Sequence, residues 1–374
     1  MRIAVPREIK DSEGRVAITP SGVHELVRHG HQVGVETGAG AGASISDADF
    51  AAAGATVLPD AAATWEFGEL ILKVKEPVPA EYDFLREGQL LFAFLHLAAN
   101  KELTAELVKR KVTALAYETV ELPDGSLPLL APMSEVAGRL APQIGAYYLM
   151  SAQQGRGVLL GGVSGVYSAR VLILGAGVAG MNAATMAIGM QADVVVMDRD
   201  ISRLRLADAQ HRGRCQTVAA NAFEIDRAVA SADLIIGAVL LPGARTPRLI
   251  SNEQIATMKP GSVVVDISVD QGGCFADSRP TAHSDPTYRV HDTTFYCVTN
   301  MPGTVANTST YALTNMTMPY VLQLAEQGCR EALRGSDSLA KGVATHGGAL
   351  VSEPVGAAHG MPTTPLASLL GSPA

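Results

Sequence analysis

The chain has 374 residues, of which 47% are hydrophobic and 18% charged, a composition that supports packed cores in about two to three domains and excludes a disordered chain. The net charge of −8, without a basic run or stripe, argues against nucleic acid as a partner. A charged amino terminus and the lack of a long apolar stretch predict no signal peptide and no membrane partner. The four scattered cysteines predict neither a metal site nor disulfides. We therefore expect a cytoplasmic protein.

The first third of the chain alternates expected strands and helices. A short strand at 3–5 precedes a helix that Thr19 caps, with Pro20 in its first turn, and that Gly30 ends. The further elements expected here are strands around Val33 and Val35 and at 70–74, 90–95 and 113–117, with a helix at 101–110. Apolar runs separated by helices are typical of a parallel sheet that is covered on both faces.

A second alternating set follows a long expected helix at 134–150, which Pro142 is expected to kink. Its expected strands lie at 171–174, 194–197, 234–239, 263–267 and 295–298. A helix is expected from Val305 to about Glu326, and a frayed tail after Gly360. The sequence therefore predicts an α/β fold with two domains, one at 130–305 and one formed by 1–129 plus 306–374.

A glycine motif opens the second set. The strand at 171–174 runs into G-x-G-x-x-G with Gly175, Gly177 and Gly180, and a helical pattern begins at Val178. The first glycine allows a tight turn, the second lets the backbone approach a pyrophosphate, and the third lets the helix pack closely on the strand. The strand context makes a dinucleotide site the preferred interpretation over a glycine-rich turn without a ligand.

The second strand of this unit ends at Asp198, near the spacing expected for the residue that accepts hydrogen bonds from a ribose. A carboxylate there repels a 2′-phosphate and favours NAD over NADP. The neighbouring Arg199 and Arg203 weaken that preference.

Four polar residues fall in loops or at strand ends in the two domains: Arg15, Lys75, His96 and Asp270. Open α/β sheets bind ligands beyond the carboxyl ends of their strands, so these residues suggest a site in a cleft between the domains. Each also has a plain alternative: a loop charge for Arg15, a solvated strand end for Lys75, a core or rim histidine for His96 and a turn residue for Asp270. Asp266, inside its expected strand, is interpreted as structural.

The chain resembles the alanine dehydrogenase family, with its related transhydrogenase nucleotide-binding subunits, over essentially its whole length. The matching segments are PREIKDSEGRVAITP, LKVKEP, LFAFLHLAAN, LGAGVAG, DLIIGAVLLPG, VVVDISVDQGGCF and FYCVTNMPGTVANTSTYALTN. The resemblance implies two Rossmann-like domains, the first completed by the carboxyl-terminal segment, and a homo-oligomer, expected to be a hexamer.

The resemblance also implies roles. Arg15 matches the arginine that pairs with the substrate carboxylate, and Lys75 matches the lysine that holds the carboxylate and carbonyl region. His96 matches the general acid/base, and Asp270 matches the acidic residue that completes the site. Residues that match nucleotide-contacting positions are Ser134, Gly175, Gly177, Val178, Gly180, Asp198, Arg203, Val239, Asn300 and Met301. Leu130 and Met133 are expected to limit space around a methyl group.

The implied reaction is the reversible, NAD-dependent oxidative deamination of L-alanine to pyruvate and ammonia, with His96 activating water. Three alternatives stay open: a transhydrogenase-type NAD-binding subunit, a dehydrogenase of another amino acid such as a saccharopine-type enzyme, and a non-catalytic NAD-binding sensor.

Overall fold

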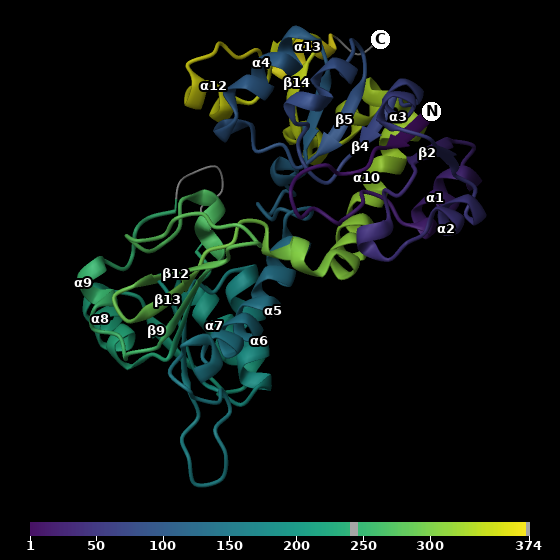
Figure 1. Cartoon of the computed structure of the whole chain (residues 1–374). Helices are drawn as coiled ribbons and strands as arrows, with labels where there is room; N and C mark the ends of the chain where they lie inside the picture. Colours follow the sequence, from purple (N-terminus) through teal and green to yellow (C-terminus); the bar gives the residue numbers. More distant parts are fainter. Residues whose placement is uncertain (240–245, 372–374) are drawn as a thin grey trace. The chain divides into compact units, whose positions relative to one another are not determined.

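The computed structural model describes residues 1–239 and 246–371. The chain divides into two compact units, unit 1 with Met1–Met133 and Val305–Ala374, and unit 2 with Ser134–Thr304. Each unit is built on one sheet with helices around it (Figure 1). The segment DLIIGAVLLPG, one of those that carry the family resemblance, extends past Val239 beyond the described residues.

Unit 1 contains an eight-stranded sheet in the order β15-β14-β6-β5-β4-β1-β2-β3. The strands from β1 to β6 pair in parallel, whereas β14 runs antiparallel to β6 and β15 antiparallel to β14. Their bounds are β1 Arg2–Val5, β2 Gln32–Glu36, β3 Thr56–Leu58, β4 Leu70–Leu72, β5 Leu90–Ala93, β6 Thr113–Ala116, β14 Val343–His346 and β15 Ala349–Leu350. The strand order reverses at β1, the kind of position where open α/β sheets bind ligands.

The central strands of unit 1 are buried on both faces. In β4, Leu70 and Leu72 belong to one apolar cluster and Ile71 to the cluster on the other face. The same alternation holds in β5 for Phe92 and Leu91. Continuous apolar runs therefore form parallel strands here because each face of the sheet has its own layer of helices to pack against.

The helices of unit 1 are α1 Pro20–Arg28, α2 Asp47–Ala52, α3 Ala61–Phe67, α4 Lys101–Lys109, α10 Ala306–Gly335, α11 Asp337–Lys341, α12 Glu353–His359 and α13 Leu366–Leu370. The hydroxyl of Thr19 accepts a hydrogen bond from the Gly22 N–H, so Thr19 is the N-cap that the sequence predicts. Helix α10 is interrupted at Gly328, which has φ 75° and ψ 162°. Among the described residues, the structure contains no helix with the length and apolar character that crossing a membrane requires.

Unit 2 contains a seven-stranded sheet in the order β12-β13-β11-β10-β7-β8-β9, parallel except for β12. Its strands are β7 Arg170–Leu174, β8 Asp193–Asp198, β9 Gln216–Ala219, β10 Leu234–Gly237, β11 Val263–Asp266, β12 Thr287–Val290 and β13 Thr293–Tyr296. Its helices are α5 Ala131–Tyr148, whose first three residues belong to unit 1, α6 Val178–Gly189, α7 Ile201–His211, α8 Ala222–Ser231 and α9 Asn252–Ile255. The order reverses at β7, as in a dinucleotide-binding Rossmann sheet, so the prediction of two α/β units with mostly parallel sheets is confirmed.

Several expected boundaries are wrong. The fifth strand ends at Ala93, so His96 lies beyond the strand rather than on it, with left-handed backbone angles of φ 47° and ψ 38°. The residues after Gly360 are not frayed throughout, because α13 forms and the Arg334 guanidinium donates to the Leu370 carbonyl over 2.7 Å. The expected helix end near Glu326 lies close to the interruption of α10 at Gly328, after which the helix resumes and reaches Gly335.

Candidate active site

Three of the predicted site residues follow neighbouring strands of unit 1. Arg15 lies in the segment after β1, Lys75 follows β4, and His96 follows β5. These strands pair in parallel in the order β1-β4-β5, so the three segments leave the same edge of the sheet at its reversal point. The fourth residue, Asp270, belongs to unit 2.

Arg15 is buried and held by a carboxylate two residues before it. Its Nε donates to Glu13 Oε1 over 2.7 Å and its Nη2 to Glu13 Oε2 over 2.5 Å, so Glu13 occupies the Nε–Nη2 edge of the guanidinium. The side chains of Arg15 and Glu13 are 2% and 1% exposed. Burial acts to raise the pKa of Glu13, but the hydrogen bonds and charge of Arg15 outweigh it and lower that pKa. The carboxylate therefore stays ionised and fixes the plane of the guanidinium.

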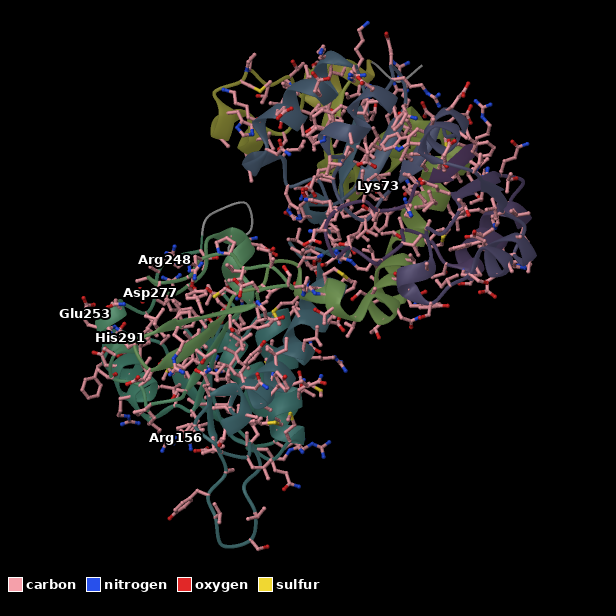
Figure 2. All side chains as sticks on the ribbon, viewed as in Figure 1. Lys73, Arg156, Arg248, Glu253, Asp277 and His291 are labelled. Carbon is pink, nitrogen blue, oxygen red and sulfur yellow. The ribbon has the colours of Figure 1, made fainter. Side chains whose placement is uncertain are left out.

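A second buried ion group supports the segment that carries Lys75. Lys73, labelled in Figure 2, has its Nζ 3.1 Å from Glu8 Oε2 and 2.8 Å from Glu81 Oε1. Burial opposes the charge of Lys73, but the two carboxylates outweigh it and raise its pKa. Glu8 Oε1 also accepts hydrogen bonds from the backbone N–H groups of Val74 over 2.6 Å and Lys75 over 3.3 Å. The loop after β4 is therefore anchored to the loop after β1.

Lys75 lies within electrostatic reach of the Arg15 pair. Its charge adds to the effects that lower the pKa of Glu13, after those of Arg15. The Lys75 residue is partly exposed, whereas Arg15 is buried. The structure thus brings two cations together around one carboxylate, an arrangement that suits the binding of a further anionic group.

His96 is an exposed side chain on a fixed backbone. Its backbone N–H donates to Glu118 Oε1 over 2.6 Å, and the same carboxylate accepts from the N–H of Leu95. The imidazole stacks on Phe94, with ring centroids 6.0 Å apart and planes 5° from parallel, and its Nδ1 lies 3.9 Å from Glu118 Oε1. With 44% of the side chain exposed, the ring can reach solvent water.

Met133 lies beside the Arg15 guanidinium. The Nη1 of Arg15 is 3.1 Å from Met133 Sδ, on the side that Glu13 does not occupy. Met133 is buried, and Leu130 packs partly buried against the same apolar cluster. A small group attached next to a carboxylate bound at Arg15 would therefore meet an apolar surface.

The glycine motif of unit 2 forms the turn between β7 and α6. Gly175 has φ +99°, and a Cβ there would lie 2.6 Å from the Ala238 carbonyl oxygen. A Cβ at Gly180 would lie 1.8 Å from the Gly175 carbonyl oxygen, whereas one at Gly177 would meet nothing within 4 Å. Helix α6 begins at Val178, which is exposed, and Gly177 supplies no side-chain cap to its first N–H groups. The open backbone at Gly177 and the helix amino terminus fit a dinucleotide pyrophosphate.

Asp198 lies at the end of β8, as predicted, and supports the glycine turn. Its Oδ2 accepts from the Ala176 N–H over 2.8 Å, and its Oδ1 accepts from the Asp200 N–H over 2.9 Å. Arg203 Nη1 lies 3.8 Å from Asp198 Oδ2. The carboxylate therefore stands beside the motif with one arginine close to it.

The other predicted nucleotide contacts occupy three segments of unit 2. Val239 follows β10, next to Ala238, which faces Gly175. Ser134 is in the first turn of α5, and α5 packs closely on α6, because a Cβ at Gly138 would lie 2.2 Å from the Ala179 carbonyl oxygen (Figure 1). The remaining two, Asn300 with φ 62° and the buried Met301, precede Val305.

Asp270 is exposed on the 3₁₀ turn Ile267–Gln271, directly after β11. That turn is tied to the segment after β10, since Ser268 Oγ donates to the Val239 carbonyl over 2.7 Å. Asp270 and Val239 are therefore held in one local framework.

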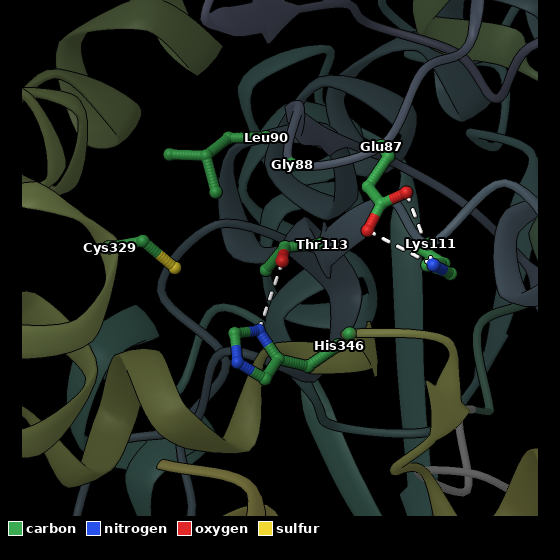
Figure 3. Close-up of a pocket in the computed structure, with 8 residues that line it drawn as sticks. Glu87, Gly88, Leu90, Lys111, Thr113, Cys329 and His346 are labelled. Carbon is green, nitrogen blue, oxygen red and sulfur yellow. Dashed lines mark hydrogen bonds and ion pairs between the residues drawn. The ribbon is translucent and has the colours of Figure 1, made fainter.

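A hollow in unit 1 lies at the opposite strand ends. Figure 3 shows its lining, which includes Leu90 and Thr113, the first residues of β5 and β6. Its polar groups pair with each other: His346 Nδ1 is 2.9 Å from Thr113 Oγ1, and Lys111 Nζ is 3.1 Å from Glu87. No predicted site residue lines it, and across residues 1–239 and 246–371 no three His, Cys, Asp or Glu side chains are grouped to hold a metal ion.

The amino-acid sequence alone does not reveal the acidic residues that hold Arg15 and Lys73. Glu13 lies two residues before Arg15, but a mixed run of charges does not reveal which pairs become buried. Glu8 and Lys73 are equally hard to recognise from the sequence. Lys73 is the first residue after the apolar strand β4, and Lys75 follows it two residues later.

Comparisons with known proteins cover nearly the whole chain. Residues 4–137 match the family described as alanine dehydrogenase/PNT, N-terminal domain, and residues 141–353 match the C-terminal domain of the same family. The alanine dehydrogenase of Mycobacterium tuberculosis (strain CDC 1551 / Oshkosh) is 58% identical over 370 residues, 99% of this chain and 100% of that protein. The alanine dehydrogenase of Halomonas elongata is 53% identical over 371 residues, again 99% and 100%.

Solved structures agree. A structure titled L-alanine dehydrogenase superposes with a TM-score of 0.93 at 50% identity, covering 96% of this chain and 99% of that one. A transhydrogenase from Sinorhizobium meliloti gives a TM-score of 0.83 at 26% identity, covering 94% and 100%. The resemblance drawn from the sequence motifs is therefore confirmed. The chain belongs to the alanine dehydrogenase/PNT family.

Proposed function

We propose that the chain is an alanine dehydrogenase. The reaction converts L-alanine, NAD⁺ and water to pyruvate, NADH, ammonium and a proton, and it runs in both directions. Full-length identity to alanine dehydrogenases supports this function. The observation that carries it is that Arg15, Lys75 and His96 follow the neighbouring parallel strands β1, β4 and β5 at one edge of the unit 1 sheet, next to its reversal point.

In this proposal the substrate carboxylate binds at Arg15 and Lys75. Glu13 fixes the plane of the Arg15 guanidinium, and Met133 lies beside the Nη1 of Arg15. Lys75 adds a second positive charge and reaches toward the carbonyl or amino-bearing carbon. The methyl group of alanine then faces Met133 and Leu130, which limits the size of the side chain accepted.

His96 is the proposed general acid/base. It removes a proton from the water that attacks the imino carbon and returns it as ammonia leaves. Glu118 lies on the Nδ1 side of the ring, so Nε2 is the nitrogen proposed to exchange the proton. The hydrogen bond from the His96 N–H to Glu118 and the left-handed backbone angles of His96 fix the backbone from which the imidazole extends.

NAD is proposed to bind unit 2, with Gly175, Gly177, Val178 and Gly180 at the pyrophosphate and Asp198 at the adenosine ribose. When bound, NAD supplies the hydride acceptor that oxidation of the α-carbon requires. Further proposed contacts are Ser134, Arg203, Val239, Asn300 and Met301. Asp270 is the proposed second catalytic residue, because an exposed carboxylate suits hydrogen bonds from the substrate amino group or from ammonium.

Unit 1 is accordingly proposed as the substrate domain and unit 2 as the NAD-binding domain. We further propose a cytoplasmic location, which four cysteines present as free thiols support. The proposed assembly is a hexamer, so light scattering should give six times the chain mass of 39.0 kDa.

The test is the oxidation of NADH by the purified protein with pyruvate, with and without ammonium, followed by the loss of NADH absorbance. Oxidation that requires both pyruvate and ammonium supports the proposal. Tight NADH binding without such turnover would instead favour a transhydrogenase-type subunit or a sensor, and turnover with a different keto acid alone would favour a dehydrogenase of another amino acid.

A further inference from the structure

Asp266 is a buried carboxylate at the end of β11, four residues before Asp270. It is 0% exposed. Its Oδ1 accepts from the Ser268 N–H over 3.0 Å and from Cys274 Sγ over 3.7 Å. Its Oδ2 accepts from the Cys274 N–H over 3.1 Å and from Ser278 Oγ over 2.5 Å. One side chain thus binds both the start and the end of the loop that carries Asp270.

The surrounding glycines leave room for this carboxylate. Gly273 has φ +79°, and a Cβ there would lie 2.4 Å from Asp266 Oδ2. A Cβ at Gly237 would lie 2.4 Å from Cys274 Sγ and 3.0 Å from Asp266 Oδ1. The loop closes over the carboxylate through hydrogen bonds from the Gly272 N–H to the Val269 carbonyl over 2.9 Å and from the Gly273 N–H to the Ser268 carbonyl over 3.0 Å.

The same loop is joined to the segment that follows β10. Ser268 Oγ donates to the Val239 carbonyl over 2.7 Å, and the Thr246 N–H donates to the Gln271 carbonyl over 3.0 Å. Asp266 therefore holds the turn Ile267–Gln271, and this turn holds Val239 through the Ser268 hydroxyl. The two proposed functional positions of this region, Val239 and Asp270, share one anchor.

The contacts of Asp266 suit an ionised carboxylate. All four groups directed at its two oxygens are donors. Burial raises the pKa of Asp266, and the hydrogen bonds from Ser278, Ser268 and Cys274 oppose that shift. An amide at this position has one acceptor oxygen and one NH₂ donor, so it can satisfy only one end of the loop.

We propose that Asp266 is a positioning residue for Asp270: its carboxylate sets the turn Ile267–Gln271 so that the Asp270 carboxylate is presented for the reaction. This inference rests on the proposed function. Displacement of a reacting group by about 1 Å can cost about 100-fold in rate, so loss of the anchor should act on turnover. The carboxylate-binding groups Arg15 and Lys75 belong to unit 1, so substrate affinity should change little.

The test compares Asp266→Asn, Asp270→Asn and the double variant by kcat, by KM for pyruvate and by hydrogen exchange of the Gly272 and Gly273 amides. We expect Asp266→Asn to lower kcat about 10- to 100-fold, to leave KM within about twofold, and to speed exchange of both amides. Because it acts through Asp270, it should lower kcat little further in the Asp270→Asn background.

Ser278→Ala keeps the inference testable if Asp266→Asn does not fold. It removes one donor to Oδ2 and should lower kcat in the same direction by a smaller factor. An unchanged kcat with faster amide exchange would make Asp266 structural only and overturn the inference. An equal loss in the Asp270→Asn background would overturn it as well, because Asp266 would then act elsewhere.

Failure of the proposed function gives a different pattern. In that case the unaltered protein shows no ammonium-dependent turnover of pyruvate, or Asp270→Asn keeps full activity, and the inference falls with its premise. If only the inference about Asp266 is wrong, the unaltered protein is active and the Asp270→Asn variant is impaired.

Discussion

Glu13 binds one edge of the Arg15 guanidinium through two hydrogen bonds of 2.7 and 2.5 Å, in a place where neither side chain is more than 2% exposed. A bidentate contact fixes the plane of the guanidinium as well as its position. The pair therefore fixes the orientation of the Arg15 guanidinium in unit 1.

Glu13→Gln should raise KM for pyruvate about tenfold, because an amide cannot accept on both arms and the guanidinium loses its fixed plane. Steady-state kinetics measure this directly. Glu36→Gln is the matched control, since Glu36 is also buried in unit 1 but accepts from the Arg7 N–H instead. A KM unchanged in Glu13→Gln would show that Arg15 does not bind the carboxylate in this orientation.

The same pair predicts a pH-dependent stability. The folded pKa of Glu13 lies below its ordinary value of 4.5, so its ionised form stabilises the fold above about pH 4.5, and this contribution is lost as the pH falls through the folded pKa. The difference in unfolding free energy between the unaltered protein and Glu13→Gln should therefore be constant near neutrality and shrink below pH 4.5. Urea titrations at several pH values measure it, and a difference that grows on acidification would be inconsistent with the pairing.

His96→Ala should lower kcat by about 10² to 10⁴-fold, the usual contribution of a general acid/base, while NADH binding to unit 2 stays nearly the same. Turnover assays and NADH fluorescence titration separate the two effects. A variant with substantial residual kcat would remove His96 from the proposed role. Glu118→Gln, which weakens the support of the His96 backbone, should lower kcat by a smaller factor.

Asp198→Ala should weaken the preference for NAD over NADP, because the carboxylate that repels a 2′-phosphate is gone. It should also weaken NAD binding itself, since the Ala176 N–H loses its acceptor. Asp208→Ala is the control, because Asp208 is an exposed carboxylate on α7 of the same unit. An unchanged ratio of the two affinities would mean that Arg199 and Arg203 determine the preference.

Gly180→Ala should abolish NADH binding or the stability of unit 2, because its Cβ would lie 1.8 Å from the Gly175 carbonyl oxygen. Gly189→Ala tests the specificity of this effect in the same helix, since a Cβ there would meet nothing within 4 Å. Thermal unfolding and NADH titration should show normal behaviour for Gly189→Ala. Equal damage from both substitutions would show that helix α6 tolerates no change of this kind.

The sequence predicts the sheets well because their strands are continuous apolar runs buried on both faces. Leu70, Ile71 and Leu72 show this, since each is no more than 1% exposed. The glycine turn and Asp198 could also be located, because each requires a specific residue type at a fixed place in one βαβ unit.

What the sequence does not predict depends on contacts between distant segments. Strand β5 ends before His96 because the Glu118 carboxylate, 22 residues later, accepts from the Leu95 and His96 N–H groups. Asp266 was expected to be structural, and only its contacts to Ser268, Cys274 and Ser278 connect it to Asp270. Such pairings follow from tertiary folding and leave no periodic pattern in the chain.

The most direct test of the central claim uses L-alanine deuterated at its α-carbon, incubated with the purified protein and NAD. If the chain oxidises alanine, mass spectrometry of the cofactor will show NADH that carries one deuterium. The deuterated alanine will be consumed, and pyruvate will be formed. NADH without deuterium, or no NADH at all beside demonstrable NAD binding, would contradict the assignment of this chain as an alanine dehydrogenase.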